Sequence, residues 1–118
     1  MKRARPIHLN LFVIRQPLPA LVSFGHRVSG ALLFLGIPIL LLTLQSVLTG
    51  TTELVARPTF RFALFVVLAA YAFHFFAGLR FLLLDLHLGG ELHSTRRAAT
   101  VVSIAAAISI VLLGVWLW

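Results

Sequence analysis

The chain has 118 residues, of which 60% are hydrophobic and only 11% are charged, and its mean hydropathy is +1.04. A soluble globular domain carries about 25% charged residues, so this composition excludes that class. The net charge of +7 comes from basic residues that flank apolar blocks, which favours an anionic membrane surface over nucleic acid as their partner. Cysteine is absent, which excludes disulfides, thiolate metal sites and cysteine nucleophiles.

Three apolar blocks in the chain are long enough to cross a bilayer. A hydrocarbon core about 30 Å thick requires about 20 helical residues. Pro38 falls within the first block, where a membrane helix tolerates a kink if neighbouring groups satisfy the freed carbonyl. We therefore predict an all-α integral membrane protein, a single membrane-anchor domain over residues 1–118, with three transmembrane helices at about residues 20–49, 60–80 and 97–118.

The distribution of positive charge predicts the orientation of these helices. Five lysine and arginine residues precede the apolar core of the first block, two flank the first loop, three flank the second loop and none follows the third block. Cytoplasmic loops of membrane proteins carry the excess of positive residues. We therefore expect the N-terminus and the second loop to be cytoplasmic.

A polar face is predicted at the cytoplasmic start of the first block. Ser23, His26, Arg27 and Gly30 follow the spacing i, i+3, i+4 and i+7, which places them on one side of a helix. A guanidinium is a permanent fork of donors and suits carboxylates and carbonyl oxygens. The alternative is that Arg27 reaches the lipid headgroups and His26 is an ordinary interface residue.

His74 is the one imidazole inside the second block. Ionisable groups within a membrane are costly to bury, so they indicate a functional site. Ala70 and Gly78 lie one turn before and one turn after His74, and small residues there predict a groove for a flat macrocycle or a partner helix. A neutral imidazole is a common axial ligand of haem iron. The alternative is a histidine that forms a hydrogen bond across a helix interface.

The remaining polar residues indicate no further chemistry. Arg80 and Asp85 lie at the cytoplasmic end of the second block, where we expect a solvated pair. His87 and His93 belong to a glycine-containing loop, and their spacing is poor for a metal site. The sequence has no Ser/His/Asp arrangement and no paired carboxylates, so the chain alone is not a conventional enzyme.

Three motifs occur in a distinctive order: Arg5-Pro6, then Ser23-x-x-His26-Arg27-Val28-Ser29-Gly30, then His74-x-x-x-Gly78-x-Arg80-x-x-x-x-Asp85. Together they resemble the cytochrome b membrane-anchor subunit of succinate dehydrogenase, respiratory complex II, over nearly the whole chain. The resemblance implies a three-helix subunit of a bacterial inner membrane that forms half of a heterodimeric helix bundle. Its expected partners are a second three-helix anchor subunit, an iron–sulfur subunit, a flavoprotein subunit and membrane lipid.

The same resemblance implies roles for individual residues. His74 matches the axial ligand of haem b, and therefore the metal-binding position. Ser23 and Arg27 match positions of the ubiquinone pocket, and Asp85 matches an acidic position near the quinone. His26 and Arg27 match positions near the haem propionates.

Two features of the sequence limit which residue roles can be assigned from the resemblance. Phe81 stands where some family members carry a histidine, so no role is transferred to that position. Met1 is the only methionine, and no histidine besides His74 was assigned to the interior of a span, so we expect the second axial ligand to come from a partner chain.

Three alternative functions remain open from the sequence. A fumarate reductase-type anchor shares the architecture, although the Ser23-x-x-His26-Arg27 element favours the first assignment. A small proton-coupled transporter would use His74 as a proton relay, but such proteins usually need an acid inside the membrane. A structural anchor without a cofactor would use His74 only to join helices.

Overall fold

The computed structural model describes residues 15–86 and 92–118, and the side chains of residues 15–86 and 95–118. In these ranges every regular element is a helix. They are α1 (Leu18–Thr49), α2 (Glu53–Ala56), α3 (Pro58–Asp85) and α4 (Leu92–Leu117). Three of them, α1, α3 and the Thr95–Leu117 part of α4, are long and apolar enough to cross a membrane. This confirms the predicted all-α membrane fold with three spans.

Proline and glycine set the ends of the first two long helices. Pro17 caps α1 in an extended conformation and Pro19 occupies its first turn, while Pro58 opens α3. Proline suits these positions because its fixed φ matches a helix and its missing N–H has no partner there in any case. At the other end of α1, Gly50 adopts a left-handed φ of 69°, which ends the helix. Pro38 lies inside α1 without ending it, as expected.

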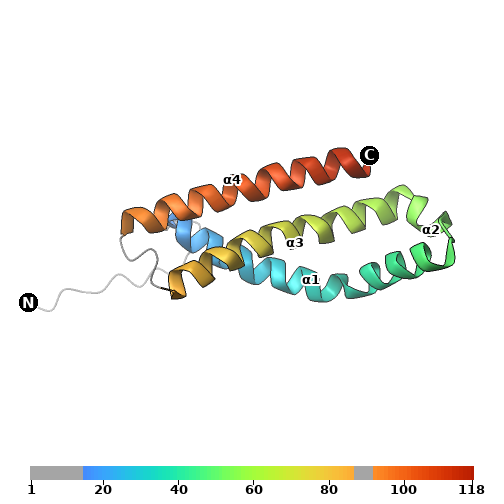
Figure 1. Cartoon of the computed structure of the whole chain (residues 1–118), viewed down its shortest axis with the longest axis horizontal. Coiled ribbons are helices and arrows are strands. Elements are labelled where there is room, and N and C mark those ends of the chain that lie inside the picture. Colours follow the sequence, from blue (N-terminus) through green and yellow to red (C-terminus); the bar gives the residue numbers. More distant parts are fainter. Residues whose placement is uncertain (1–14, 87–91) are drawn as a thin grey trace, which may run out of the picture.

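The long helices form an antiparallel bundle in which α3 is the central member (Figure 1). α3 packs extensively against both α1 and α4, whereas α1 and α4 share a smaller contact. The start of α1, the end of α3 and the start of α4 therefore meet at one end of the bundle, and α2 lies at the opposite end (Figure 1). We call the end of the bundle where α1 and α4 begin and α3 ends the α1-start end.

A cluster of buried residues lies toward the α1-start end. Val22, Ala77 and Ala99 are buried together, one from each long helix, and Phe73 and Val102 pack against them. Small residues such as alanine let helix backbones approach closely in a membrane. This packing fixes the relation of α1 to α3 beside His26 and His74.

The helices extend somewhat beyond the predicted spans. α1 begins at Leu18, α3 continues to Asp85, and α2 is a short helix that the sequence pattern did not predict. Some residues to which the sequence predictions refer lie outside the described residues: Arg5, Pro6 and His87, two other basic residues of the N-terminal segment, Lys2 and Arg3, and the side chain of His93.

Candidate functional site

The His74 ring lies between α3 and α1 and is partly buried. Its Nδ1 atom is 3.1 Å from the hydroxyl oxygen of Ser29 and 3.1 Å from the backbone oxygen of His26. The Ser29 hydroxyl also donates a hydrogen bond of 2.9 Å to the same His26 oxygen. These three polar groups form a closed cluster that ties the middle of α3 to α1.

The His26 ring covers one face of the His74 ring. The two imidazoles are nearly parallel, with centroids 3.9 Å apart and planes at 13°. Phe81 packs its ring edgewise against His26, with centroids 5.2 Å apart. The plane of the His74 ring is therefore set by α1 as well as by its own helix.

Two glycines make room for this pair of imidazoles. A Cβ atom placed on Gly30 would lie 3.1 Å from Cε1 of His74, which is closer than ordinary side-chain contacts. A Cβ atom on Gly78 would lie 3.4 Å from Nε2 of His26. The groove expected around Gly78 is thus occupied by His26 at this point, because glycine leaves space for a ring.

Ser23, His26 and Arg27 all belong to α1, and the structure divides them between two directions. His26 faces α3, where it meets His74, while Arg27 is exposed and Ser23 is partly exposed. Asp85 is exposed at the last turn of α3. The end of α3 and the start of α1 meet at the same end of the bundle, so all the predicted site residues lie toward that end (Figure 1).

The expectation for Arg80 is wrong. We predicted a solvated side chain, but Arg80 is only 3% exposed, and its guanidinium carbon lies 5.2 Å from the centre of the Phe81 ring. Arg80 also lines an apolar cavity of about 380 Å³ between α3 and α4. The reason is that α3 continues past Arg80 to Asp85, so the packing of α4 covers this position.

An apolar groove lies beside the histidine cluster. Its volume is about 470 Å³, and the residues lining it, which come mainly from α1 and α3, include Ser29, Ala70 and Phe73. Ala70, predicted to border a groove near His74, is therefore placed as expected. An apolar surface next to a held imidazole is compatible with a flat hydrophobic group such as a porphyrin.

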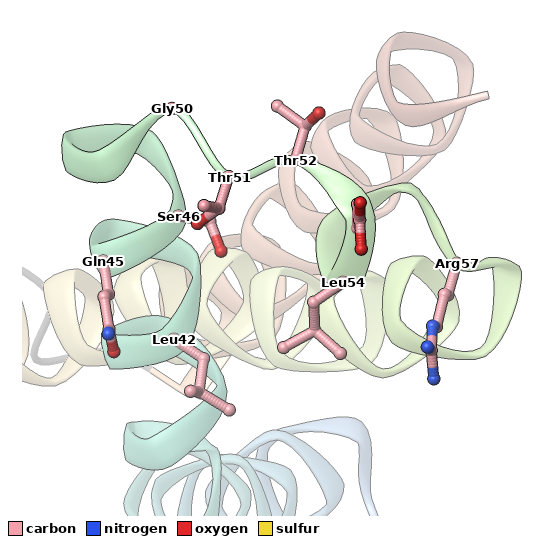
Figure 2. Close-up of a pocket in the computed structure, with 9 residues that line it drawn as sticks. Leu42, Gln45, Ser46, Gly50, Thr51, Thr52, Leu54 and Arg57 are labelled. Atoms are coloured by element: carbon pink, nitrogen blue, oxygen red, sulfur yellow. The ribbon is translucent and has the colours of Figure 1, made fainter.

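A separate polar pocket of about 610 Å³ lies at the opposite end of the bundle (Figure 2). It is formed where α1 ends and α2 begins, and Figure 2 shows Gln45, Ser46 and Arg57 around it. None of the predicted site residues lines this pocket. The pocket is therefore distinct from the histidine cluster.

Sequence reasoning missed two members of the cluster, Ser29 and Phe81. Ser29 belongs to the motif that opens the first span, and no role is predicted for it there, although it lies one turn after His26 on a helix. Phe81 was set aside because it replaces a histidine of other family members. The spacing could have indicated that Ser29 shares a face with His26, but not that this face meets His74.

Comparison with known proteins identifies a family and a similar bacterial protein. Residues 1–113 match the model of the succinate dehydrogenase/fumarate reductase transmembrane subunit family. The chain is also similar to the succinate dehydrogenase cytochrome b556 subunit of Coxiella burnetii (strain RSA 493 / Nine Mile phase I). The two are 35% identical over 126 aligned residues, and the match covers 100% of both chains.

Proposed function

The chain belongs to the succinate dehydrogenase/fumarate reductase transmembrane subunit family, and we propose that it binds haem b and forms part of a ubiquinone site in succinate:quinone oxidoreductase. It is thus a cytochrome b-type multi-pass membrane subunit. In the proposed reaction, electrons pass from a partner's iron–sulfur cluster to ubiquinone. The observation that carries this proposal is the imidazole of His74, which belongs to an apolar span and forms hydrogen bonds with the Ser29 hydroxyl and the His26 backbone oxygen of α1.

The residues around His74 suit a haem. His74 would be the axial ligand, and the adjacent apolar groove suits the hydrophobic faces of a porphyrin. Haem b, when bound, supplies one-electron transfer close to the quinone. Arg27 is exposed at the same end of the bundle, where a guanidinium can pair with a propionate, and His26 is its neighbour in the chain.

The second axial ligand is proposed to come from a partner chain. Among the residues whose side chains the structure describes, His26 carries the other imidazole, and it is stacked face to face on His74 at 3.9 Å. Two imidazoles that ligate one iron from opposite sides of a porphyrin cannot stack on each other. His26 as it lies is therefore not the opposite ligand, and Met1 is the only methionine of the chain.

The proposed quinone site uses Ser23, Arg27 and Asp85. Ser23 and Arg27 are one turn apart on α1, and both can donate hydrogen bonds to a quinone carbonyl oxygen. Asp85 lies at the end of α3 that meets the start of α1, where a carboxylate can take part in proton delivery.

The proposed partners are a second three-helix anchor subunit, an iron–sulfur subunit and a flavoprotein subunit. Large apolar side chains such as Phe24, Phe34 and Trp116 are exposed along the helices, which indicates contact with lipid or another apolar subunit. We place the protein in a bacterial inner membrane with its N-terminus cytoplasmic, since the positive charge is concentrated on that side.

Of the three alternative functions, the small transporter does not agree with the family, whereas the fumarate reductase-type anchor does, because the family description includes both enzymes. It differs from the proposed function in the direction of electron flow. The Ser23-x-x-His26-Arg27 element favours the succinate dehydrogenase-type anchor.

The test is succinate-dependent reduction of a short-chain ubiquinone by the purified complex. We expect Ser23→Ala and Arg27→Ala to lower this activity by about 10- to 100-fold, the loss of one hydrogen bond to a partly buried group. Succinate-dependent dye reduction, which needs only the peripheral subunits, should be unchanged.

Two matched substitutions serve as controls. Ser109→Ala removes a hydroxyl that bonds only to its own helix in α4, and Arg57→Ala removes an exposed guanidinium at the opposite end of the bundle. Full quinone reduction by both Ser23→Ala and Arg27→Ala would contradict the proposed quinone site.

A further inference from the structure

The hydrogen bonds around His74 join two helices, and they also indicate which ring nitrogen of His74 carries the proton. The backbone oxygen of His26 can only accept hydrogen bonds. Because it lies 3.1 Å from Nδ1 of His74, that nitrogen must carry a proton to bond with it. A neutral imidazole with its proton on Nδ1 has its lone pair on Nε2.

The geometry of Ser29 agrees with this proton assignment. Its hydroxyl donates to the His26 oxygen at 2.9 Å, so its own oxygen is free to accept. The Nδ1 proton of His74 is then shared between two acceptors, the Ser29 hydroxyl and the His26 carbonyl, each at 3.1 Å. Each proton in the cluster then has an acceptor, whereas a Ser29 hydroxyl that donated to an unprotonated Nδ1 would leave that nitrogen and the His26 oxygen, two acceptors, facing each other at 3.1 Å.

We propose that Ser29 is a positioning residue that, with the His26 carbonyl, holds the proton of His74 on Nδ1 and thereby presents Nε2 to the haem iron. This inference rests on the proposed function. Metal-binding histidines typically donate their second N–H to a carbonyl or other acceptor, which fixes the ring and raises the basicity of the ligating nitrogen. Here both acceptors come from α1, a different helix from the one that carries the ligand.

Burial gives Ser29 more influence than a surface serine would have. Its side chain is only 5% exposed, so water does not replace the hydroxyl readily. A hydrogen bond in such a low-dielectric environment is electrostatically stronger than one in water. The stacked ring of His26 limits rotation of the imidazole, and Gly30 lets α1 approach it.

This arrangement has a consequence for the redox behaviour of the haem. An acceptor at Nδ1–H gives the imidazole more anionic character, which stabilises the oxidised iron relative to the reduced iron. Removal of the Ser29 hydroxyl should therefore raise the midpoint potential of the haem. It should also lower the affinity for haem, because the His74 imidazole is then less well oriented.

The test uses the purified, fully assembled complex carrying Ser29→Ala. We expect a midpoint potential above that of the wild type in a redox titration. We also expect the transfer of haem to excess apomyoglobin to be about tenfold faster, since loss of such a supporting bond costs about 10- to 100-fold in metal affinity. The substitution removes one oxygen atom and keeps a good helix former, so folding should be preserved.

Two further variants show whether the hydroxyl itself is responsible. Ser29→Thr keeps a hydroxyl that can bond to the same carbonyl one turn back, and it should restore both properties toward wild type. Ser46→Ala removes another buried serine of α1, near the opposite end, and should change neither.

Several results would overturn the proposal. They are wild-type values in Ser29→Ala, equal changes in Ser29→Ala and Ser46→Ala, or no restoration by Ser29→Thr. Failure of the proposed function would look different: the wild-type complex would lack haem, or His74→Ala would leave its spectrum unchanged.

Discussion

His74 is held by weak bonds whose main effect is on orientation. Hydrogen bonds between membrane helices contribute on average about 0.6 kcal/mol each. The two contacts of His74 Nδ1 with Ser29 and His26 therefore stabilise the bundle by on the order of 1 kcal/mol. This is small beside the total stability of a folded chain, but it is enough to favour one proton position and one ring plane.

The close approach of Gly30 to His74 gives a prediction at the residue scale. In Gly30→Ala the new methyl group would lie 3.1 Å from Cε1 of His74, so the ring must move by a few tenths of an ångström. We expect the affinity for haem to fall about tenfold, which is the lower end of the loss expected when a group that supports a metal ligand is disturbed. Haem per assembled complex, measured as the pyridine haemochrome, checks this.

Gly114→Ala is the matched control for that substitution. Its methyl group would lie 3.5 Å from Phe65, an ordinary contact, and far from the histidine cluster in the chain. Equal haem content in Gly30→Ala and wild type would show that the space at Gly30 is not needed.

The sequence indicated His74 and His26 as candidate site residues but did not predict their contact. The charge and periodicity of α1 place His26 on a helical face, and the apolar surroundings of His74 mark it as unusual. How α1 is rotated about its own axis relative to α3 depends on packing between the helices, such as Val22 against Ala77. For the same reason the contact of Ser29 with His74 could not be read from spacing along one helix.

At the scale of elements, the contact between α1 and α3 depends on small residues. Gly36 is buried against Val67, and a Cβ atom at Gly36 would lie 2.6 Å and 2.8 Å from the two methyl carbons of that valine. Valine is β-branched and has little freedom at χ1, so it cannot turn away cheaply. The α1–α3 contact therefore tolerates no side chain at Gly36 without movement.

We predict that Gly36→Ala destabilises the bundle. Overpacking costs about 1–3 kcal/mol, which outweighs the gain of about 1 kcal/mol in helix propensity from Gly to Ala. Adding Val67→Ala to Gly36→Ala should recover part of the loss, because it removes the two methyl groups that clash. The apparent melting temperature in detergent, measured for each variant, checks both statements.

If the double variant loses more stability than the two single variants lose together, this account of the contact is contradicted. Additive effects would also argue against it, because residues in direct contact are expected to couple.

The helix ends show what sequence patterns specify well at the element scale. Pro19 and Pro58 lie in the first turns of α1 and α3, and Gly50 directly follows α1, so proline and glycine lie where their backbone chemistry suits a helix end. The extension of α3 to Asp85 and the burial of Arg80 were not predicted, because a charged residue normally marks the end of an apolar span. Packing of α4 over α3 overrides that rule here.

At the scale of the whole molecule, the three spans form a thin layer with much apolar surface on the outside. Phe34 is 73% exposed and Trp116 is 77% exposed. Cofactors in helix bundles are generally held between facing helices, so a second set of helices is expected beside α1 and α3. Composition predicted that three spans alone leave apolar surface exposed, but not which faces of the helices remain uncovered.

The proposed orientation can be tested by labelling. Since the chain has no cysteine, a single introduced cysteine is the only thiol of this chain, and its labelling is read on the isolated subunit. In spheroplasts, a membrane-impermeant maleimide should label Thr51→Cys, which lies between α1 and α2, at the end opposite the positive charge. It should label Arg97→Cys, at the start of α4, only after the membrane is disrupted. The reverse pattern would contradict a cytoplasmic N-terminus.

The most direct test of the account is the dithionite-reduced minus oxidised absorption spectrum of the purified complex, with wild type beside His74→Ala. Tyr71→Phe, an exposed neighbour on α3, is the control. We predict a b-type α-band in wild type and Tyr71→Phe that is lost or shifted in His74→Ala, because His74 supplies an axial ligand. An unchanged α-band in an assembled His74→Ala complex, or no haem in the assembled wild type, would contradict the assignment.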